Sequence, residues 1–318
     1  MKIKGSVRSL QINHAFIIFA VASVLAVGVR IFQVFSGIID FDTGFYEVTH
    51  VTTPILYLIL GFASVGIFLV SLLAGEIPQE KMPQKKSIPV ALFSAGFAAS
   101  LVYSAVNQIG SFLEYIEKAN TVLMADSKLL MSDMMKSGAL PRLGEGVFAI
   151  VSAIFFLLIF INYTGIKTIN FSKIKIFTIA PLFWATFRMV QRFTRTISFM
   201  NVSSLLFELF MIAFMMMFFM YFAQMASEVN NNAISFKVFA YGLIAAMFSA
   251  VVSIPRALLL IFDGDYRAMM EWNMIECPLE ITDILFLGFV VFFLILCLSS
   301  PRIKNMTAKE TEKLTEEK

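Results

Sequence analysis

The sequence is poor in the residues that form redox centres and metal sites. Its 318 residues include two cysteines and two histidines. Cys277 and Cys297 would lie about 30 Å apart if the segment between them is helical, at ~1.5 Å per residue, which is far beyond the reach of a disulfide. His14 and His50 stand at opposite ends of the first predicted hairpin, so they do not form a haem pair or a zinc cluster. We therefore predict that the protein has no cofactor and no metal site.

Charged residues are also scarce. They make up 15% of the chain, whereas hydrophobic residues make up 58% and the mean hydropathy is +0.81. A soluble domain is roughly 45–50% apolar, so this chain is predicted to be a multi-pass membrane protein that contacts the lipid bilayer. The net charge of +3 is small and the basic residues lie in short loops, which argues against nucleic acid as a partner.

The sequence does contain long apolar runs. A helix needs roughly 20 residues to cross ~30 Å of hydrocarbon, and eight runs approach or exceed this length. The fourth run is the shortest and the fifth is the most polar. We predict an all-α integral membrane fold of eight transmembrane helices. The predicted spans are 14–35, 51–74, 88–109, 147–163, 176–193, 203–226, 238–261 and 281–298.

Lysine and arginine are unevenly distributed between the two ends of these spans. The side that holds the N-terminus contains most of the basic residues outside the spans, while acidic residues such as Asp40, Asp263 and Glu276 lean to the other side. Because cytoplasmic loops of membrane proteins are enriched in Lys and Arg, we expect both termini to be cytoplasmic, in a cell membrane. Residues 301–318 then form a charged cytoplasmic tail.

The longest predicted outer loop is 111–142. Apolar residues including Leu123, Leu130 and Met134 recur in it among charged residues. This spacing is typical of an amphipathic helix, and we expect the segment to lie along the membrane surface.

Two spans end in the same short pattern. Arg30-x-x-Gln33 closes the first run and Arg188-x-x-Gln191 closes the fifth, and three weaker matches follow in order along the later spans. We predict a duplication into two tandem parallel four-helix units, related by an axis along the membrane normal. Chance similarity among apolar helices is the alternative. The predicted units are 1–163 and 164–300.

Several charged or polar residues lie inside the predicted spans, where an ionisable group is costly and marks a functional site by default. Their positions along the spans place them one or two turns below the outer surface. Six such groups on six helices therefore form one layer in the outer leaflet, with more arginines than carboxylates. These groups are Arg30, Asn107, Arg188, Glu208, Arg256 and Asp283.

This layer has two interpretations. In the first, an outward-open pocket binds an anionic small molecule or a lipid headgroup through bidentate arginine contacts. In the second, Arg188 pairs with Glu208 and the other arginines reach lipid phosphates, so that the layer only holds the helices together. The candidate ligand-binding residues are Arg30, Gln33, Asn107, Arg188, Gln191, Arg192 and Arg256, with Glu208 and Asp283 as charge partners.

The leading functional hypothesis is a non-enzymatic membrane protein that binds, and transports or senses, an anionic or amphiphilic ligand from the outer side. A membrane scaffold or partner subunit without a ligand is the first alternative. The second is an intramembrane lipid-modifying enzyme that uses Glu208 or Asp283 as an acid or base. The sequence has no nucleophile with a suitable base and no phosphate-binding loop, which disfavours the enzyme.

Overall fold

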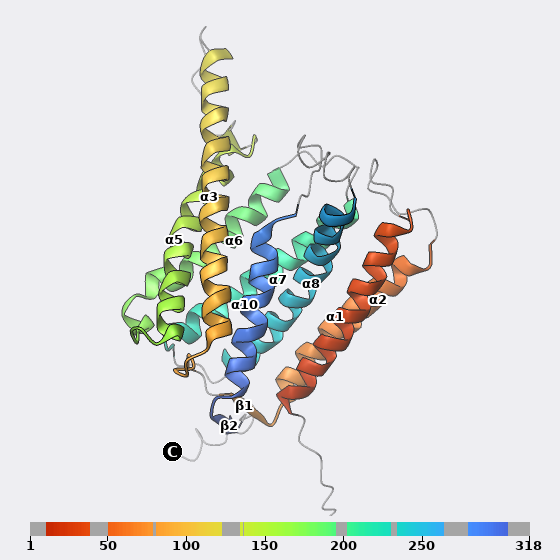
Figure 1. Cartoon of the computed structure of the whole chain (residues 1–318), viewed down its shortest axis with the longest axis vertical. Coiled ribbons are helices and arrows are strands. Elements are labelled where there is room, and N and C mark those ends of the chain that lie inside the picture. Colours follow the sequence, from red (N-terminus) through yellow and green to blue (C-terminus); the bar gives the residue numbers. More distant parts are fainter. Residues whose placement is uncertain are drawn as a thin grey trace, which may run out of the picture.

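The computed structural model describes residues 11–38, 50–78, 81–122, 134–135, 137–194, 202–229, 234–263 and 279–304. These residues are almost entirely helical (Figure 1). The long helices are α1 (Ile12–Phe35), α2 (Thr52–Leu73), α3 (Ile88–Val122), α5 (Ala139–Thr164), α6 (Lys175–Thr194), α7 (Val202–Ala226), α8 (Ile234–Phe262) and α10 (Ile281–Leu298). The short elements are the 3-10 helix η1 (Phe171–Lys173) and the strands β1 (Glu76–Pro78) and β2 (Arg302–Lys304).

Seven of these helices are long and apolar enough to cross a membrane by length and composition. The faces that these helices turn away from the bundle carry large exposed apolar side chains, such as Val24 and Phe62, each 74% exposed. Apolar surface of this extent is unfavourable in water and matches a lipid environment. The chain is therefore a multi-pass membrane-embedded helical protein.

Helix α6 occupies the fifth predicted span, but it is not among the seven apolar helices of the described chain. Its 20 residues include Lys175, Arg188 and Arg192, which lower its hydropathy. Its length of about 30 Å, at ~1.5 Å per residue, still equals the thickness of the hydrocarbon layer.

Helix α3 differs from the prediction at its C-terminal end. It has 35 residues and is about 52 Å long at ~1.5 Å per residue, so it exceeds the hydrocarbon layer. It protrudes beyond the neighbouring helices (Figure 1). Residues 111–122 of the predicted surface helix thus continue α3, and residues 139–142 begin α5. Between these helices the structure describes 134–135 and 137–138, and 123–133 and 136 lie outside the described residues.

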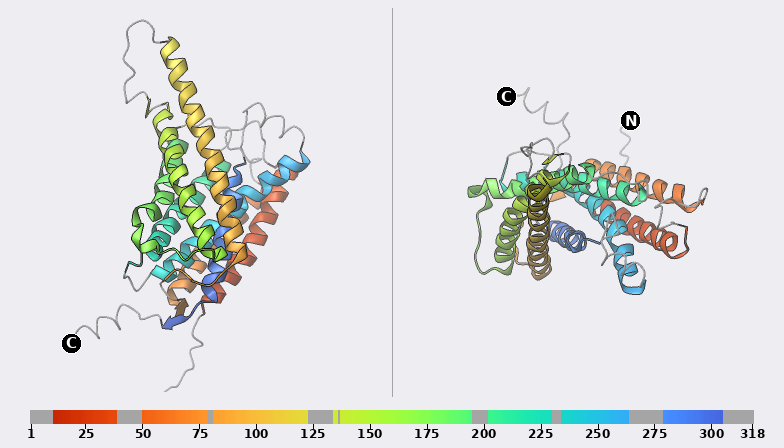
Figure 2. Two further views of the ribbon diagram at one scale, coloured as in Figure 1. Left: turned by 60° about the vertical axis from the view of Figure 1, so that its left-hand side comes forward. Right: turned by 90° about the horizontal axis from the view of Figure 1, so that it is seen from above.

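Helix α8 lies at the centre of the bundle. It is buried along most of its length and packs against α1, α2, α7 and α10. A helix that is hydrophobic on all sides needs neighbours on all sides, and the sequence of α8 meets this condition. Seen from above, α10 lies between α3 and α8 (Figure 2).

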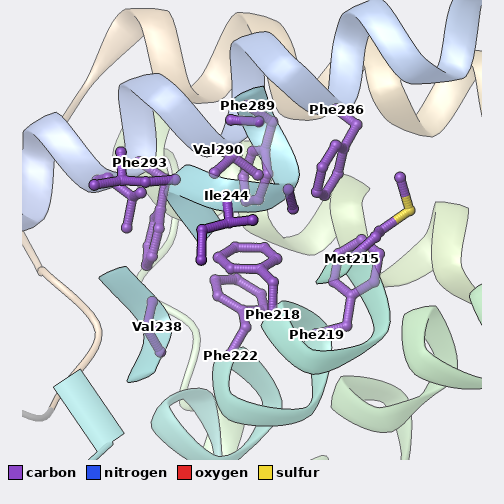
Figure 3. Packing of buried hydrophobic residues seen from close by; sticks show 14 of the residues in the cluster. Met215, Phe218, Phe219, Phe222, Val238, Ile244, Phe286, Phe289, Val290 and Phe293 are labelled. Carbon is purple, nitrogen blue, oxygen red and sulfur yellow. The ribbon is translucent and has the colours of Figure 1, made fainter. Parts of the chain in front are cut away.

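The core next to α8 is aromatic. Phenylalanines of α10 point toward those of α7 (Figure 3). Phe219 and Phe286 have ring centroids 5.5 Å apart, and Phe222 and Phe293 5.0 Å. Trp184 of α6 meets Phe219 edge-to-face, so the same cluster also holds α6.

The contacts between helices cross the boundary of the two predicted units. The hairpin of α1 and α2 packs against α8, and α3 packs against α5 and α10. In a symmetric repeat the α3–α10 contact would have an α8–α5 counterpart, whereas α8 packs mainly on α1, α2, α7 and α10. Contacts thus run across the boundary between the units 1–163 and 164–300, and both the division into units and the duplication stay predictions from sequence.

A small backbone sheet joins three distant segments at one end of the bundle. Strand β1 pairs antiparallel with β2, and Gln11, just before α1, bridges to Glu76 of β1. The start of α1 and the end of α10 therefore lie at the same end, at the bottom of Figure 1. We call the sheet of β1 and β2, together with the bridging residue Gln11, the terminal ribbon.

Candidate functional site: a buried network of arginines and carboxylates

The charged residues of α6 face the interior of the bundle. Arg188 and Arg192 are four residues apart, so they lie on the same side of the helix. Both are buried, together with Trp184 one turn earlier and Gln191. The polar face of α6 therefore points inward, and this face is the basis of the site.

Arg188 contacts three carboxylates. Its Nη1 and Nη2 donate to Oδ1 and Oδ2 of Asp283 at 2.7 and 3.0 Å, which is a bidentate pair. Its Nη2 also lies 2.9 Å from Oε2 of Glu280 and 3.6 Å from Oε1 of Glu208. The Arg188 side chain is 0% exposed, so these groups replace its hydration.

Arg192 and Arg256 complete the network. Nε of Arg192 donates to Oε1 of Glu208 at 2.7 Å, and its Nη2 contacts Oε1 of Glu280. Nη1 and Nη2 of Arg256 lie 3.4 and 3.5 Å from Oε2 of Glu208. Glu208 therefore bridges arginines of α6 and α8. We call Arg188, Arg192, Glu208, Arg256, Glu280 and Asp283 the arginine network.

The up-and-down arrangement of the helices brings these residues together. Each lies within about two turns of the end of its helix, at the end of the bundle opposite the terminal ribbon. Asp283 is in the first turn of α10 and Arg192 in the last turn of α6. A negative charge at a helix N-terminus and a positive charge at a C-terminus are both favoured by the helix dipole.

The predicted excess of positive charge in this layer was wrong. Arg188, Arg192 and Arg256 meet three carboxylates in direct contact, because Glu280, which stands just before the last predicted span, turns inward. A fourth carboxylate, Glu145, is buried on α5 and acts electrostatically on Arg192. Glu145 precedes the predicted fourth span by only two residues, and the imbalance itself was the signal that carboxylates were missing.

The predicted alternative pair of Arg188 and Glu208 exists, but it is not the shortest pair of either residue. Arg188 lies closest to Asp283, and Glu208 lies closest to Arg192. The spacing of four residues on α6 lets the two arginines share Glu208.

Arg30 of α1 lies beside the network. Its Nη1 is 3.4 Å from Oε1 of Gln33, and its guanidinium stands 5.3 Å from the ring centroid of Phe207. Phe207 immediately precedes Glu208 on α7. Arg30 therefore contacts the apolar neighbour of the central carboxylate through a cation–π interaction.

The predicted glutamines connect neighbouring helices. Nε2 of Gln33 donates to Oγ1 of Thr52 on α2 at 3.1 Å, and Nε2 of Gln191 donates to Oε1 of Gln108 on α3 at 3.0 Å. The prediction that Asn107 faces the layer was wrong, because its side chain is exposed and Gln108, the next residue, faces inward. Neighbouring residues of a helix point in directions that differ by about 100° around the helix axis. An apolar run predicts how deep a residue lies in the membrane, but not which way its side chain points.

The network offers little for metal binding or acid–base chemistry. Among the described residues, no group of three or more His, Cys, Asp or Glu side chains is arranged to hold a metal ion. Both oxygens of Asp283 and both of Glu208 are engaged by arginines. The geometry is that of charge compensation between helices.

The fold and the site together define a class: a helical membrane protein with a buried, charge-balanced network at one end of the bundle. Comparisons with protein-family models, with curated proteins and with solved structures find no match.

Proposed function

We propose that this chain is a non-enzymatic membrane scaffold or partner subunit of eight transmembrane helices, and that the arginine network fastens α6, α7, α8 and α10 at one end of the bundle. The observation that carries this proposal is the sharing of Glu208, a fully buried carboxylate of α7, among Arg188, Arg192 and Arg256. Removing one partner from a buried network leaves an uncompensated charge, which is strongly destabilising.

The terminal ribbon supports eight crossings. Gln11 and Lys304 are joined through β1 at one end of the bundle, which supports an even number of crossings for the chain between them. Seven crossings would separate these residues by the membrane. With α6 as the eighth span, its arginines are compensated by carboxylates of neighbouring helices, which lowers the cost of placing them in the membrane.

The distribution of basic residues supports a cytoplasmic position for the terminal ribbon. Lys85 and Lys86 follow β1, and Lys167 and Lys173 lie in the loop between α5 and α6 at the same end. By the positive-inside rule this end is cytoplasmic, and the arginine network lies toward the outer surface.

A charge exchange tests the fastening role. Arg188→Asp alone or Asp283→Arg alone should lower the melting temperature of the purified protein in a non-ionic detergent, because each leaves like charges buried together. A buried pair broken on one side costs about 3–5 kcal/mol. The double variant Arg188→Asp/Asp283→Arg should be more stable than either single variant, because it restores an opposite-charge pair at 188 and 283. Recovery should be partial, because the new carboxylate at 188 lies beside Glu208 and Glu280.

The matched control is the exposed pair of Glu114 and Lys118, whose charged atoms are 4.0 Å apart. Reversing either charge there should leave the melting temperature unchanged, since exposed pairs contribute little. A single Arg188 variant as stable as this control would refute the fastening role.

Binding of an anionic ligand from the outer side, with transport or sensing, is the second candidate. The observation that favours it is the position of Glu280, whose side chain is 21% exposed while it contacts two arginines that are at most 2% exposed. The network therefore reaches the surface of the bundle through Glu280. No contact in the described residues favours a lipid-modifying enzyme, since the two carboxylates it would need are engaged by arginines.

A further inference from the structure

Arg188 and Arg192 hold the carboxylate of Glu280 between them. Oε2 of Glu280 lies 2.9 Å from Nη2 of Arg188, and its Oε1 contacts Nη2 of Arg192. Each oxygen of one carboxylate thus meets a different guanidinium. Two arginines that grip both oxygens of one anion form the arrangement by which proteins bind carboxylates and phosphates.

Glu280 is held less firmly than the other two carboxylates of the network. Its side chain is 21% exposed, whereas those of Glu208 and Asp283 are 1% exposed. Glu280 is the N-cap residue of α10, has an extended backbone and makes no side-chain capping bond to the helix. Because it lies outside the helix, its side chain can leave the arginines without unfolding α10.

We propose that Arg188 and Arg192 form an anion-binding site that Glu280 fills from within the chain, and that an external carboxylate or phosphate competes with Glu280 for it. The anion is a free solute or the headgroup of an anionic lipid, which share this chemistry. The site rests on the second candidate function above and does not depend on the fastening role.

Departure of Glu280 would make the site attractive to an anion. Arg188 would keep Asp283, and Arg192 and Arg256 would keep Glu208, which leaves three arginines against two directly bonded carboxylates. Nε of Arg188 is a further buried donor without a hydrogen-bond acceptor among the described residues. The expected replacement is therefore an anion with at least two acceptor oxygens.

Chemical rescue with acetate tests this site. Glu280→Ala removes the internal carboxylate, and the purified variant in non-ionic detergent should melt at a lower temperature than the wild type. Sodium acetate should raise this melting temperature saturably, with half of the effect on the order of 1 mM to tens of mM. Sodium chloride at equal ionic strength should not, and the wild type should respond much less because Glu280 competes.

Two matched variants separate site binding from general salt effects. Asp283→Ala removes a carboxylate of the same network that is 1% exposed, so acetate should not rescue it. Glu280→Ala/Arg192→Gln also lacks the Glu280 carboxylate but has lost one of the two arginines. Acetate should therefore no longer raise its melting temperature. Equal rescue of Asp283→Ala, or rescue that persists without Arg192, would overturn the proposal. So would a Glu280→Ala variant that acetate, inorganic phosphate and phosphatidylglycerol all fail to stabilise.

The source of the anion is distinguished by changing the additive. Inorganic phosphate tests a free solute, and mixed micelles with phosphatidylglycerol or phosphatidylcholine test a lipid headgroup. Stabilisation of Glu280→Ala by phosphatidylglycerol but not by acetate or phosphate assigns the site to lipid. The reverse pattern assigns it to a solute.

A more conservative variant covers the case in which Glu280→Ala does not fold. Glu280→Gln keeps the size of the side chain and loses its charge, so acetate should raise its melting temperature more than that of the wild type. An equal response of the two proteins would contradict the site. If no anion stabilises the Glu280 variants but the Arg188–Asp283 charge exchange restores stability, the anion site is refuted. The fastening role of the arginine network would then still stand.

Discussion

At the scale of single residues, Glu208 is the centre of the arginine network. It receives contacts from three arginines on two helices and is fully buried. A carboxylate in this position compensates charge that lipid and apolar side chains cannot compensate. Replacing its charge should therefore affect the whole end of the bundle.

Glu208→Gln measures this role with little change in volume. We expect it to lower the free energy of unfolding by about 3–5 kcal/mol, because the arginines lose their shared counter-charge. Glu117→Gln on the exposed end of α3 is the control and should have no effect. Thermal melting in detergent checks both, and equal melting temperatures would contradict a central role for Glu208.

The sequence predicted where the charged residues lie along their helices better than it predicted which residues form the arginine network. The ends of apolar runs placed Arg188, Arg256, Glu208 and Asp283 near one end of their helices, where the structure has them. Glu280 was not found because it lies just outside an apolar run, where charged residues are ordinary and carry no signal. Only the packing of α10 against its neighbours shows that its side chain turns inward.

At the scale of elements, close contacts at glycine fix the approach of α3 and α10. A Cβ atom added to Gly288 of α10 would lie 2.1 Å from Cε1 of Phe93 on α3. The Phe93 ring is itself stacked on Phe292, with centroids 5.1 Å apart, so it cannot move away freely. Small residues allow membrane helices to approach closely, and Gly288 has this role.

Gly288→Ala should therefore destabilise the protein by about 1–3 kcal/mol, the usual cost of overpacking a well-packed core. Gly61→Ala on α2 is the matched control, because nothing lies within 4 Å of a Cβ added there. The control should be neutral or slightly stabilising, since Ala favours helix over Gly. Equal melting temperatures of the two variants would show that α3 and α10 do not meet at Gly288.

The bounds of the helices show what hydropathy can and cannot predict. Seven predicted spans correspond to apolar helices, because a run of apolar residues has no other favourable conformation in lipid. The extensions of α3 to Val122 and of α5 back to Ala139 were missed. Outside the hydrocarbon a helix can carry polar residues, so its end is no longer marked by the end of an apolar run.

At the scale of the whole molecule, the number of crossings decides which segments share a side. Single cysteines placed at Lys85, Glu117 and Pro301 in a chain without Cys277 and Cys297 would report this. All three positions are exposed, and a membrane-impermeant maleimide applied to intact cells labels only those outside. We expect labelling at Glu117 and none at Lys85 or Pro301 until the cells are opened.

This pattern requires that α6 crosses the membrane. If α6 does not cross, five crossings separate Lys85 from Pro301 and only one of the two is protected in intact cells. If both lie outside and Glu117 inside, the crossings are even but the orientation is reversed. Such a result would correct the use of the positive-inside rule for this chain.

The predicted duplication into two four-helix units is also a property of the whole molecule. Arg30-x-x-Gln33 and Arg188-x-x-Gln191 both place a glutamine in an interhelical hydrogen bond, but Gln33 contacts the next helix in sequence and Gln191 contacts α3. A short pattern that repeats in the sequence does not predict which helices pack together. Packing depends on contacts between distant segments, to which a comparison of short patterns is insensitive.

The terminal ribbon has a consequence for the order in which the protein assembles during synthesis. Strand β1 follows the second helix, whereas its partner β2 follows the last, so β1 leaves the ribosome long before β2 exists. Synthesis proceeds from the N-terminus, and the pairing can close only when α10 has entered the bundle. Formation of the ribbon therefore follows the synthesis of every described helix, and a chain truncated before Arg302 would leave the β2-pairing edge of β1 exposed.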